Sequence, residues 1–115
     1  MYIVEFYDTE EGNCPAREFI YSLEPKMMAK VIRNIDLLEK NGLMLREPFS
    51  APIGDGIFEL RTKVGSSITR VFYFFVVGQK VILTNGFVKK TQKTPKRELE
   101  LARKYKADYE RRYLK

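Results

Sequence analysis

The sequence predicts a mixed α/β (α+β) domain in which helices pack on a twisted, mainly antiparallel β-sheet. Three strand-like runs lie between Ile57 and Asn85 and are joined by two short turns that contain glycine. Two helical patterns precede these runs, and a basic helical pattern follows them. Sequential strands with tight turns favour antiparallel neighbours, and an amphipathic helix must bury its apolar stripe on another element. Residues 1–115 are therefore expected to form one domain around one core.

One strand and a helical hairpin are expected before the main sheet. Tyr2–Tyr7 is rich in β-branched and aromatic residues, as strands are. A first helix is expected after Asn13, which can cap it, and it ends at Glu24 because a proline follows. A second helix runs from Pro25 to Asn41–Gly42, since glycine suits a left-handed cap. The apolar stripes comprise Ala16, Phe19, Ile20 and Leu23 in the first helix, and Met28, Val31, Ile32, Ile35 and Leu38 in the second.

A long loop and three strands come next. Prolines and glycines interrupt residues 43–56, so this segment is predicted to be a loop. Ile57–Lys63 alternates between apolar and polar residues, which predicts a strand with one buried face. Ile68–Val77 is apolar at nearly every position, as in a central strand. Gly78–Gln79 suits a two-residue turn, after which Val81–Asn85 returns.

The end of the chain is basic. Gly86–Lys93 is expected to be a connection, and Thr94–Pro95 to begin a last helix that ends near Tyr113. Its narrow apolar stripe is Leu99, Ala102, Tyr105 and Tyr109. From Lys89 onward there are 11 basic and 4 acidic residues, against 10 basic and 11 acidic before it. A neutral body with a basic end indicates a polyanionic partner, either nucleic acid or an acidic protein, although a solvated helix face gives the same pattern.

The residues that the chain lacks exclude several kinds of site. It has no histidine and one cysteine, Cys14, so no Ser–His or Cys–His nucleophile can form, and neither an internal disulfide nor a zinc site is expected. No glycine-rich phosphate-binding motif is present. No apolar run approaches the ~20 residues that span a bilayer, and the acidic N-terminus lacks the basic start of a signal peptide. We therefore expect a cytoplasmic protein without metal, cofactor or membrane contact.

Four basic residues on or beside the predicted sheet are candidates for chemistry. Arg70 interrupts an apolar strand, where a charge needs either an ion-pair partner such as Glu59 or an anionic ligand such as phosphate. Arg61 lies on the polar face of its strand, for which a solvated surface is the simpler explanation. Lys89 and Lys90 follow a strand and form either a basic loop or a phosphate-binding pair. Because adjacent lysines repel each other, one of them is suited to proton transfer.

Three segments carry a family resemblance: DGIFELR (Asp55–Arg61), TRVFYFF (Thr69–Phe75) and ILTNGFVKKTQKTP (Ile82–Pro95). In these segments the chain resembles the RelE/HigB-like toxins of bacterial type II toxin–antitoxin systems, and in particular their phage-derived branch. The resemblance implies a small RelE-like fold and a ribosome-dependent mRNA endoribonuclease. Such an enzyme works without metal, by attack of the ribose 2′-hydroxyl on the adjacent phosphate. The implied partners are the ribosome with its mRNA and a cognate antitoxin with a helix-turn-helix DNA-binding domain, in a hetero-oligomeric complex.

The resemblance also implies roles for individual residues. Arg70 would stabilise the charged phosphorane, Arg61 would contact the substrate backbone, and Lys89 and Lys90 would divide proton transfer and phosphate binding between them. Substrate binding is expected of Lys63, Tyr73, Asn85, Phe87 and Lys93. Many relatives have a histidine near the position of Asn85, whose amide cannot transfer protons. A lysine, a tyrosine or the ribosome-bound RNA must then do so.

Two other functions stay open from the sequence. The scaffold also resembles ParE-type proteins, which bind and poison DNA gyrase, and that reading predicts toxicity without RNA cleavage. A non-catalytic module that binds RNA or the antitoxin would keep its binding after single loss of Lys89 or Lys90. The joint presence of Arg61, Arg70 and the lysine pair favours the ribonuclease, although a fold does not fix a function.

Overall fold

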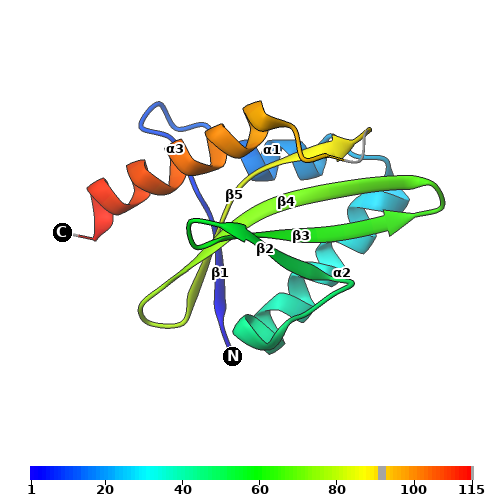
Figure 1. Cartoon of the computed structure of the whole chain (residues 1–115), viewed down its shortest axis with the longest axis horizontal. Helices are drawn as coiled ribbons and strands as arrows, with labels where there is room; N and C mark the ends of the chain where they lie inside the picture. Colours follow the sequence, from blue (N-terminus) through cyan, green and yellow to red (C-terminus); the bar gives the residue numbers. More distant parts are fainter. Residues whose placement is uncertain (91–92, 115) are drawn as a thin grey trace.

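A computed structural model describes residues 1–90 and 93–114, which form one five-stranded sheet and three α-helices (Figure 1). The elements are β1 (Ile3–Phe6), α1 (Pro15–Tyr21), α2 (Pro25–Asn41), a 3₁₀ turn (Gly42–Met44), β2 (Ser50–Gly54), β3 (Ile57–Val64), β4 (Ser67–Val76), β5 (Lys80–Lys89) and α3 (Lys96–Tyr113). The strand order is β1-β5-β4-β3-β2. Among the strands of the described residues only the β1–β5 pair is parallel, so the predicted mainly antiparallel sheet with a helical hairpin before it and a helix after it is confirmed.

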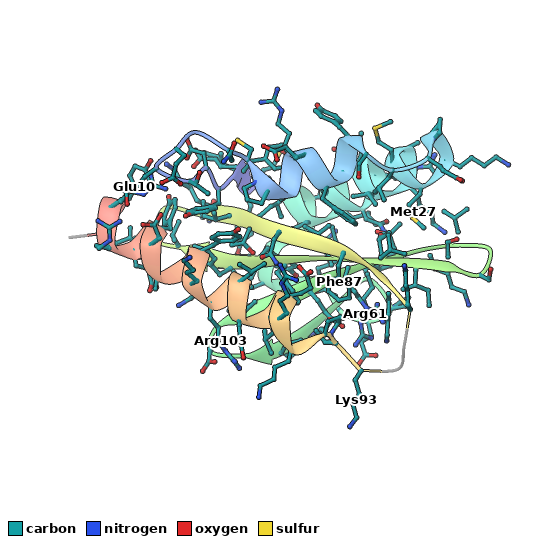
Figure 2. The ribbon with its side chains drawn as sticks, turned by 90° about the horizontal axis from the view of Figure 1, so that it is seen from above. Glu10, Met27, Arg61, Phe87, Lys93 and Arg103 are labelled. Carbon is teal, nitrogen blue, oxygen red and sulfur yellow. The ribbon has the colours of Figure 1, made fainter. Side chains whose placement is uncertain are left out.

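The helices cover both faces of the sheet, as the view along its edge in Figure 2 shows. On one face, Val31 and Leu38 of α2 and the buried part of α1 pack against Tyr73 and its neighbours. On the other face, Tyr109 of α3 packs edge-on against Phe74. α3 begins only at Lys96, and β3, β4 and β5 extend past its first turn (Figure 1). Within the described residues, one end of the sheet therefore carries no helix on the α3 face.

The buried positions of α2 differ from the apolar stripe predicted for this helix. In α2 the buried positions are Met27, Val31, Asn34 and Leu38, whereas Ile32 is 44% exposed. The stripe has the predicted helical spacing but is rotated, because α2 turns Asn34 toward the edge of β3. Asn34 donates hydrogen bonds there, which satisfies a buried amide that an apolar pattern could not predict.

Three predicted boundaries are wrong. The loop expected over residues 43–56 contains the edge strand β2, in which Pro52 is tolerated because a proline removes a donor from the outer edge of a sheet. β5 does not end at Asn85 but continues to Lys89, paired with β4. Thr94 does not cap α3 with its side chain, and Pro95 occupies the cap position. Thr91 and Gln92, in the connection predicted from Gly86 to Lys93, lie outside the described residues.

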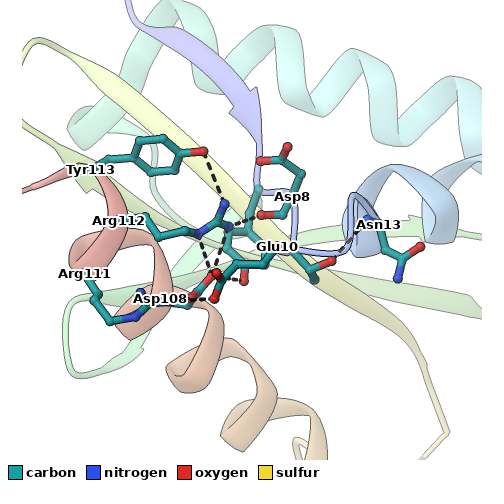
Figure 3. Close-up of polar contacts among 9 residues, drawn as sticks. Asp8, Glu10, Asn13, Asp108, Arg111, Arg112 and Tyr113 are labelled. Atoms are coloured by element: carbon teal, nitrogen blue, oxygen red, sulfur yellow. Dashed lines mark hydrogen bonds and ion pairs between the residues drawn. The ribbon is translucent and has the colours of Figure 1, made fainter.

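A network of polar contacts fastens the segment after β1 to the last turns of α3 (Figure 3). The Tyr7 hydroxyl donates a hydrogen bond to Asp108 Oδ2 at 2.6 Å, and Arg112 Nη2 lies 2.9 Å from the same oxygen. Arg111 Nη2 donates to Glu10 Oε1 at 2.7 Å. Burial and the bond to Asp108 raise the pKa of Tyr7 to about 12. The network thus joins the two ends of the chain.

The pKa of Tyr7 predicts a loss of stability at high pH. An unfolded tyrosine releases its proton near pH 10, whereas folded Tyr7 keeps it up to about pH 12, so the unfolding free energy falls as pH rises through this window. We expect Tyr7→Phe to flatten this part of the profile, measured as the urea midpoint from about pH 8 to pH 11.5. Tyr21→Phe is the control, since Tyr21 is 63% exposed. Equal slopes for the Tyr7→Phe variant and the wild type would contradict the assignment.

Candidate functional site

The sheet register places the basic side chains in two neighbouring rows on the α3 face. The rows are Arg61–Arg70–Phe87 and Lys63–Ile68–Lys89. Directly paired residues share a face of the sheet, so each row runs across β3, β4 and β5. The first turn of α3 lies over Asn85, whose Nδ2 donates to the Glu98 carbonyl oxygen at 3.1 Å. Phe87 belongs to a buried cluster with Ala102 of α3, so the two rows begin beside α3 and run toward the end of the sheet beyond its first turn.

A cleft of about 330 Å³ lies at this end, along the edge of β3. Its lining consists of the cations Lys30, Arg61, Lys63 and Arg70 together with Asn34, Pro48, Phe49, Thr62 and Ile68. β2 pairs with β3 only up to the Ser50–Leu60 pair, so the following carbonyl groups need other donors. Two residues of α2 supply them: Asn34 Nδ2 donates to the Arg61 carbonyl at 3.2 Å, and Lys30 Nζ donates to the Lys63 carbonyl at 2.5 Å. The cleft is thus walled by α2 on one side and by the basic rows on the other.

Arg70 is the most deeply buried cation of the cleft. It is 7% exposed, and its Nε has no hydrogen-bond partner within residues 1–90 and 93–114. Burial lowers the pKa of Arg70, Glu59 opposes this effect, and Arg61 adds to it. The guanidinium still stays charged, because arginine does not lose its proton in proteins. A buried charge with unused donors favours an anionic ligand, and its planar fork matches a phosphate.

Glu59 and Glu47 are the carboxylates next to this arginine pair. Glu59 is 3% exposed, and its Oε2 accepts a hydrogen bond from Arg61 Nε at 2.9 Å and lies 3.6 Å from Arg70 Nε. Glu47 Oε1 lies 3.2 Å from Arg61 Nη1 at the exposed rim. The ion pair that the sequence offered as one explanation of Arg70 is therefore present, but it leaves the hydrogen-bonding donors of Arg70 unused within the described residues.

The comparisons with known proteins agree with this architecture. The model of the family described as phage derived protein Gp49-like (DUF891) matches residues 18–107, well over half of the chain. The chain belongs to the phage-derived Gp49-like family. A chain in the crystal structure of the archaeal RelE–RelB complex from Pyrococcus horikoshii OT3 resembles the Gp49-like protein with a TM-score of 0.50 and 16% identity, over 81% of this chain and 98% of that chain. No curated protein sequence matches. The predicted RelE-like fold and phage-derived branch are thus confirmed.

Three residues expected to bind substrate are instead buried in the Gp49-like fold. Tyr73 is 1% exposed on the face covered by α1 and α2, opposite to Arg70, and its hydroxyl is hydrogen-bonded to Ser50. Asn85 is 4% exposed beneath the first turn of α3, and Phe87 is 7% exposed and packs on β4. Their burial gives each of them a structural role, and their contact with substrate stays a prediction. The physical reason for the burial is that α1 and α2 cover Tyr73, whereas β5 continues past Asn85, so that the first turn of α3 covers Asn85 and Phe87 packs on Phe72 of β4.

The other predicted residues lie at the open end of the sheet. Arg61, Arg70 and Lys63 line one cleft. Lys89, the last residue of β5, is half-buried, and Lys90 is exposed just after it. Lys93 is exposed before α3 and points away from the sheet in Figure 2. The roles assigned to these six residues stay predictions.

Sequence reasoning missed two groups of the site. Lys30, Asn34 and Phe49 reach the cleft through tertiary packing, and no local pattern marks them. Glu59 was considered only as a partner of Arg70, although it also accepts a hydrogen bond from Arg61.

Within the described ranges 1–90 and 93–114, no group of three acidic, histidine or cysteine residues could hold a metal ion, and no helix is long and apolar enough to cross a membrane.

Proposed function

We propose that the Gp49-like chain is the toxin of a type II toxin–antitoxin system and acts as a ribosome-dependent mRNA endoribonuclease. The observation that carries this proposal is Arg70, a buried cation that lines a cleft together with Lys30, Arg61 and Lys63. A phosphodiester is an anion of suitable shape for such a cleft. The membership in the phage-derived family and the RelE-like fold support the same class of protein.

The proposed reaction needs little from the protein beyond position and charge. The ribose 2′-hydroxyl of the RNA attacks the adjacent phosphorus, the bond to the 5′-oxygen of the next nucleotide breaks, and a cyclic phosphate remains. Arg70 and Arg61 stabilise the negative charge that develops on the phosphorane oxygens. Lys89 or Lys90 transfers the proton of the attacking 2′-hydroxyl to the departing 5′-oxygen, and Lys63 holds the neighbouring backbone. All except Lys90 are held on paired strands, which fixes their geometry before the substrate binds.

The proposed partners follow from the same class. One similar structure is a RelE–RelB complex, which supports a cognate antitoxin for this chain, and we expect it to carry a helix-turn-helix DNA-binding domain. The ribosome and its mRNA are the expected partners of the free toxin, which places it in the cytoplasm. Eleven basic residues from Lys89 onward suit contact with ribosomal RNA.

Cleavage mapping on a translated mRNA tests the proposal. Purified protein is added with and without ribosomes, and new 5′ ends are located by primer extension. Cuts within codons that require ribosomes are the expected result. Cuts without ribosomes would retain the ribonuclease but remove the ribosome dependence. A folded protein that stops growth without cutting RNA would overturn the proposal and direct the search to DNA gyrase.

Loss of Lys89 should weaken RNA binding in a salt-dependent way. If Lys89 contacts one phosphate, Lys89→Ala should reduce the slope of log affinity against log salt by about 0.7, as expected for single-stranded RNA. Fluorescence anisotropy with a 2′-O-methyl RNA, which cannot be cut, measures this slope. Lys40→Ala is the control, since Lys40 lies in the last turn of α2, far along that helix from Lys30. An unchanged slope for Lys89→Ala would place the RNA elsewhere.

A further inference from the structure

Glu59 is a buried carboxylate that the proposed reaction does not yet use. It lies on β3, two residues before Arg61, and it is directly paired with Phe72 of β4. Its Oε2 is 2.9 Å from Arg61 Nε and 3.6 Å from Arg70 Nε, and its Oε1 is 3.5 Å from the Thr94 hydroxyl. A carboxylate that is only 3% exposed persists because these groups compensate for its lost hydration.

One oxygen of Glu59 is therefore the common neighbour of two guanidinium groups. Arg61 and Arg70 are direct cross-strand partners, and like charges in such a pair repel each other. The carboxylate lies on the Nε side of both groups and balances part of their charge. With the Nε sides turned to Glu59, the Nη groups are the ones left for a ligand. Arg61 uses one of them on exposed Glu47, and Arg70 uses none within the described residues.

We infer that Glu59 is a positioning residue that holds Arg61 and Arg70 as a two-guanidinium clamp for one phosphodiester group. This inference rests on the proposed function for its biological substrate, but the clamp itself requires only an anion of phosphate shape. Glu59 does not serve as the base of the reaction, because its two buried carboxylate oxygens already face the two arginines and Thr94. Its effect on the substrate passes through the arginines that it fixes.

Glu47 provides a matched control on the same arginine. It also forms an ion pair with Arg61, at 3.2 Å, but its side chain is 74% exposed whereas that of Glu59 is 4% exposed. A solvated carboxylate at the rim holds its partner weakly, and an incoming phosphate can replace it. Removal of Glu47 should therefore leave phosphate binding equal or stronger.

The clamp is tested by the NMR signals of the arginine Nε–Hε groups during titration with inorganic phosphate. We expect the Arg70 signal of the wild type to shift until saturation, and the affinity to fall roughly tenfold or more in Glu59→Gln and Glu59→Asp. Glu59→Gln keeps the length of the side chain but removes its negative charge. Glu59→Asp keeps the negative charge, but its side chain is too short to contact both arginines in the same way. Glu47→Gln should not lose affinity. If Glu59 were only a nearby negative charge, Glu59→Gln would bind phosphate more tightly than the wild type, and that result would overturn the inference.

Two further outcomes separate the clamp from the proposed function. If Glu59→Gln fails to fold, Glu59→Asp decides the question, and wild-type phosphate affinity in that variant would refute the positioning role. A clamp that depends on Glu59 in a protein that cuts no RNA would leave the inference standing while the proposed function fails. Wild-type cleavage rates in the Glu59 variants would refute the inference while the proposed function stands. In an active protein we expect these variants to lower kcat more than RNA affinity, because the clamp acts on the phosphorane.

Discussion

Replacing Arg70 with alanine is expected to lower the rate of mRNA cleavage by roughly 10²–10³. The guanidinium is buried at the cleft, where a preorganised donor acts on developing charge without competition from water. Arg70→Lys should recover only part of the activity, since an ammonium group lacks the planar fork that binds two phosphate oxygens. Single-turnover cleavage on programmed ribosomes measures both variants.

The same substitution should leave the fold intact. Arg70 carries a buried charge whose Nε has no hydrogen bond within the described residues, so its loss removes a desolvation cost, while Glu59 keeps its bond to Arg61. Since Arg70 is also one of the groups that compensate for buried Glu59, we expect a folded variant with a thermal midpoint somewhat below that of the wild type. Arg17→Ala is the matched control, since Arg17 lies exposed on α1, on the opposite face. Cleavage by Arg70→Ala at the wild-type rate would remove this residue from the mechanism.

The strand pattern was sufficient to place the two arginines on neighbouring strands. Ile57–Lys63 and Ile68–Val77 are two strand-like runs joined by a short turn, which predicts an antiparallel pair, and in the structure Arg61 pairs with Arg70. The helical hairpin was equally accessible, because proline and glycine mark its ends and its apolar residues repeat at helical spacing. These features are local, and local chemistry decides them.

The remaining features depend on contacts between distant segments. Alternation in β3 assigned Glu59 to a polar face, but it could not show that the arginines and the segment before α3 would bury that face. Phe87 looks like a residue of a basic connection until the pairing of β5 with β4 extends the strand past it, and nothing local shows that α3 would cover Asn85 at the predicted strand end. Asn34 at the cleft follows from an edge of β3 that lacks a strand partner beyond Leu60 within residues 1–90 and 93–114.

Gly86→Ala is expected to destabilise the protein and to disturb the site together. Gly86 pairs with Val71 in the β4–β5 ladder, beside a shift in register. A Cβ atom there would lie 2.5 Å from the ring of Phe19 in its present position and 2.9 Å from the carbonyl oxygen of Arg70. The ring can move, but the Arg70 carbonyl belongs to a central strand, so the backbone must shift. Overpacking of this kind costs about 1–3 kcal/mol.

The urea midpoint measures the loss of stability, and cleavage at a temperature where the variant stays folded measures the effect on the site. Because the clash moves the backbone that carries the Arg70 guanidinium, we expect activity to fall further than the folded fraction does. Val88→Ala is the control on the same strand, since Val88 is 45% exposed and lies two residues away. A Gly86→Ala variant with unchanged midpoint and unchanged cleavage would show that Phe19 alone absorbs the added methyl group. The position of Arg70 would then tolerate movement in β5, and the close packing between β5, α1 and β4 would have no part in fixing the site.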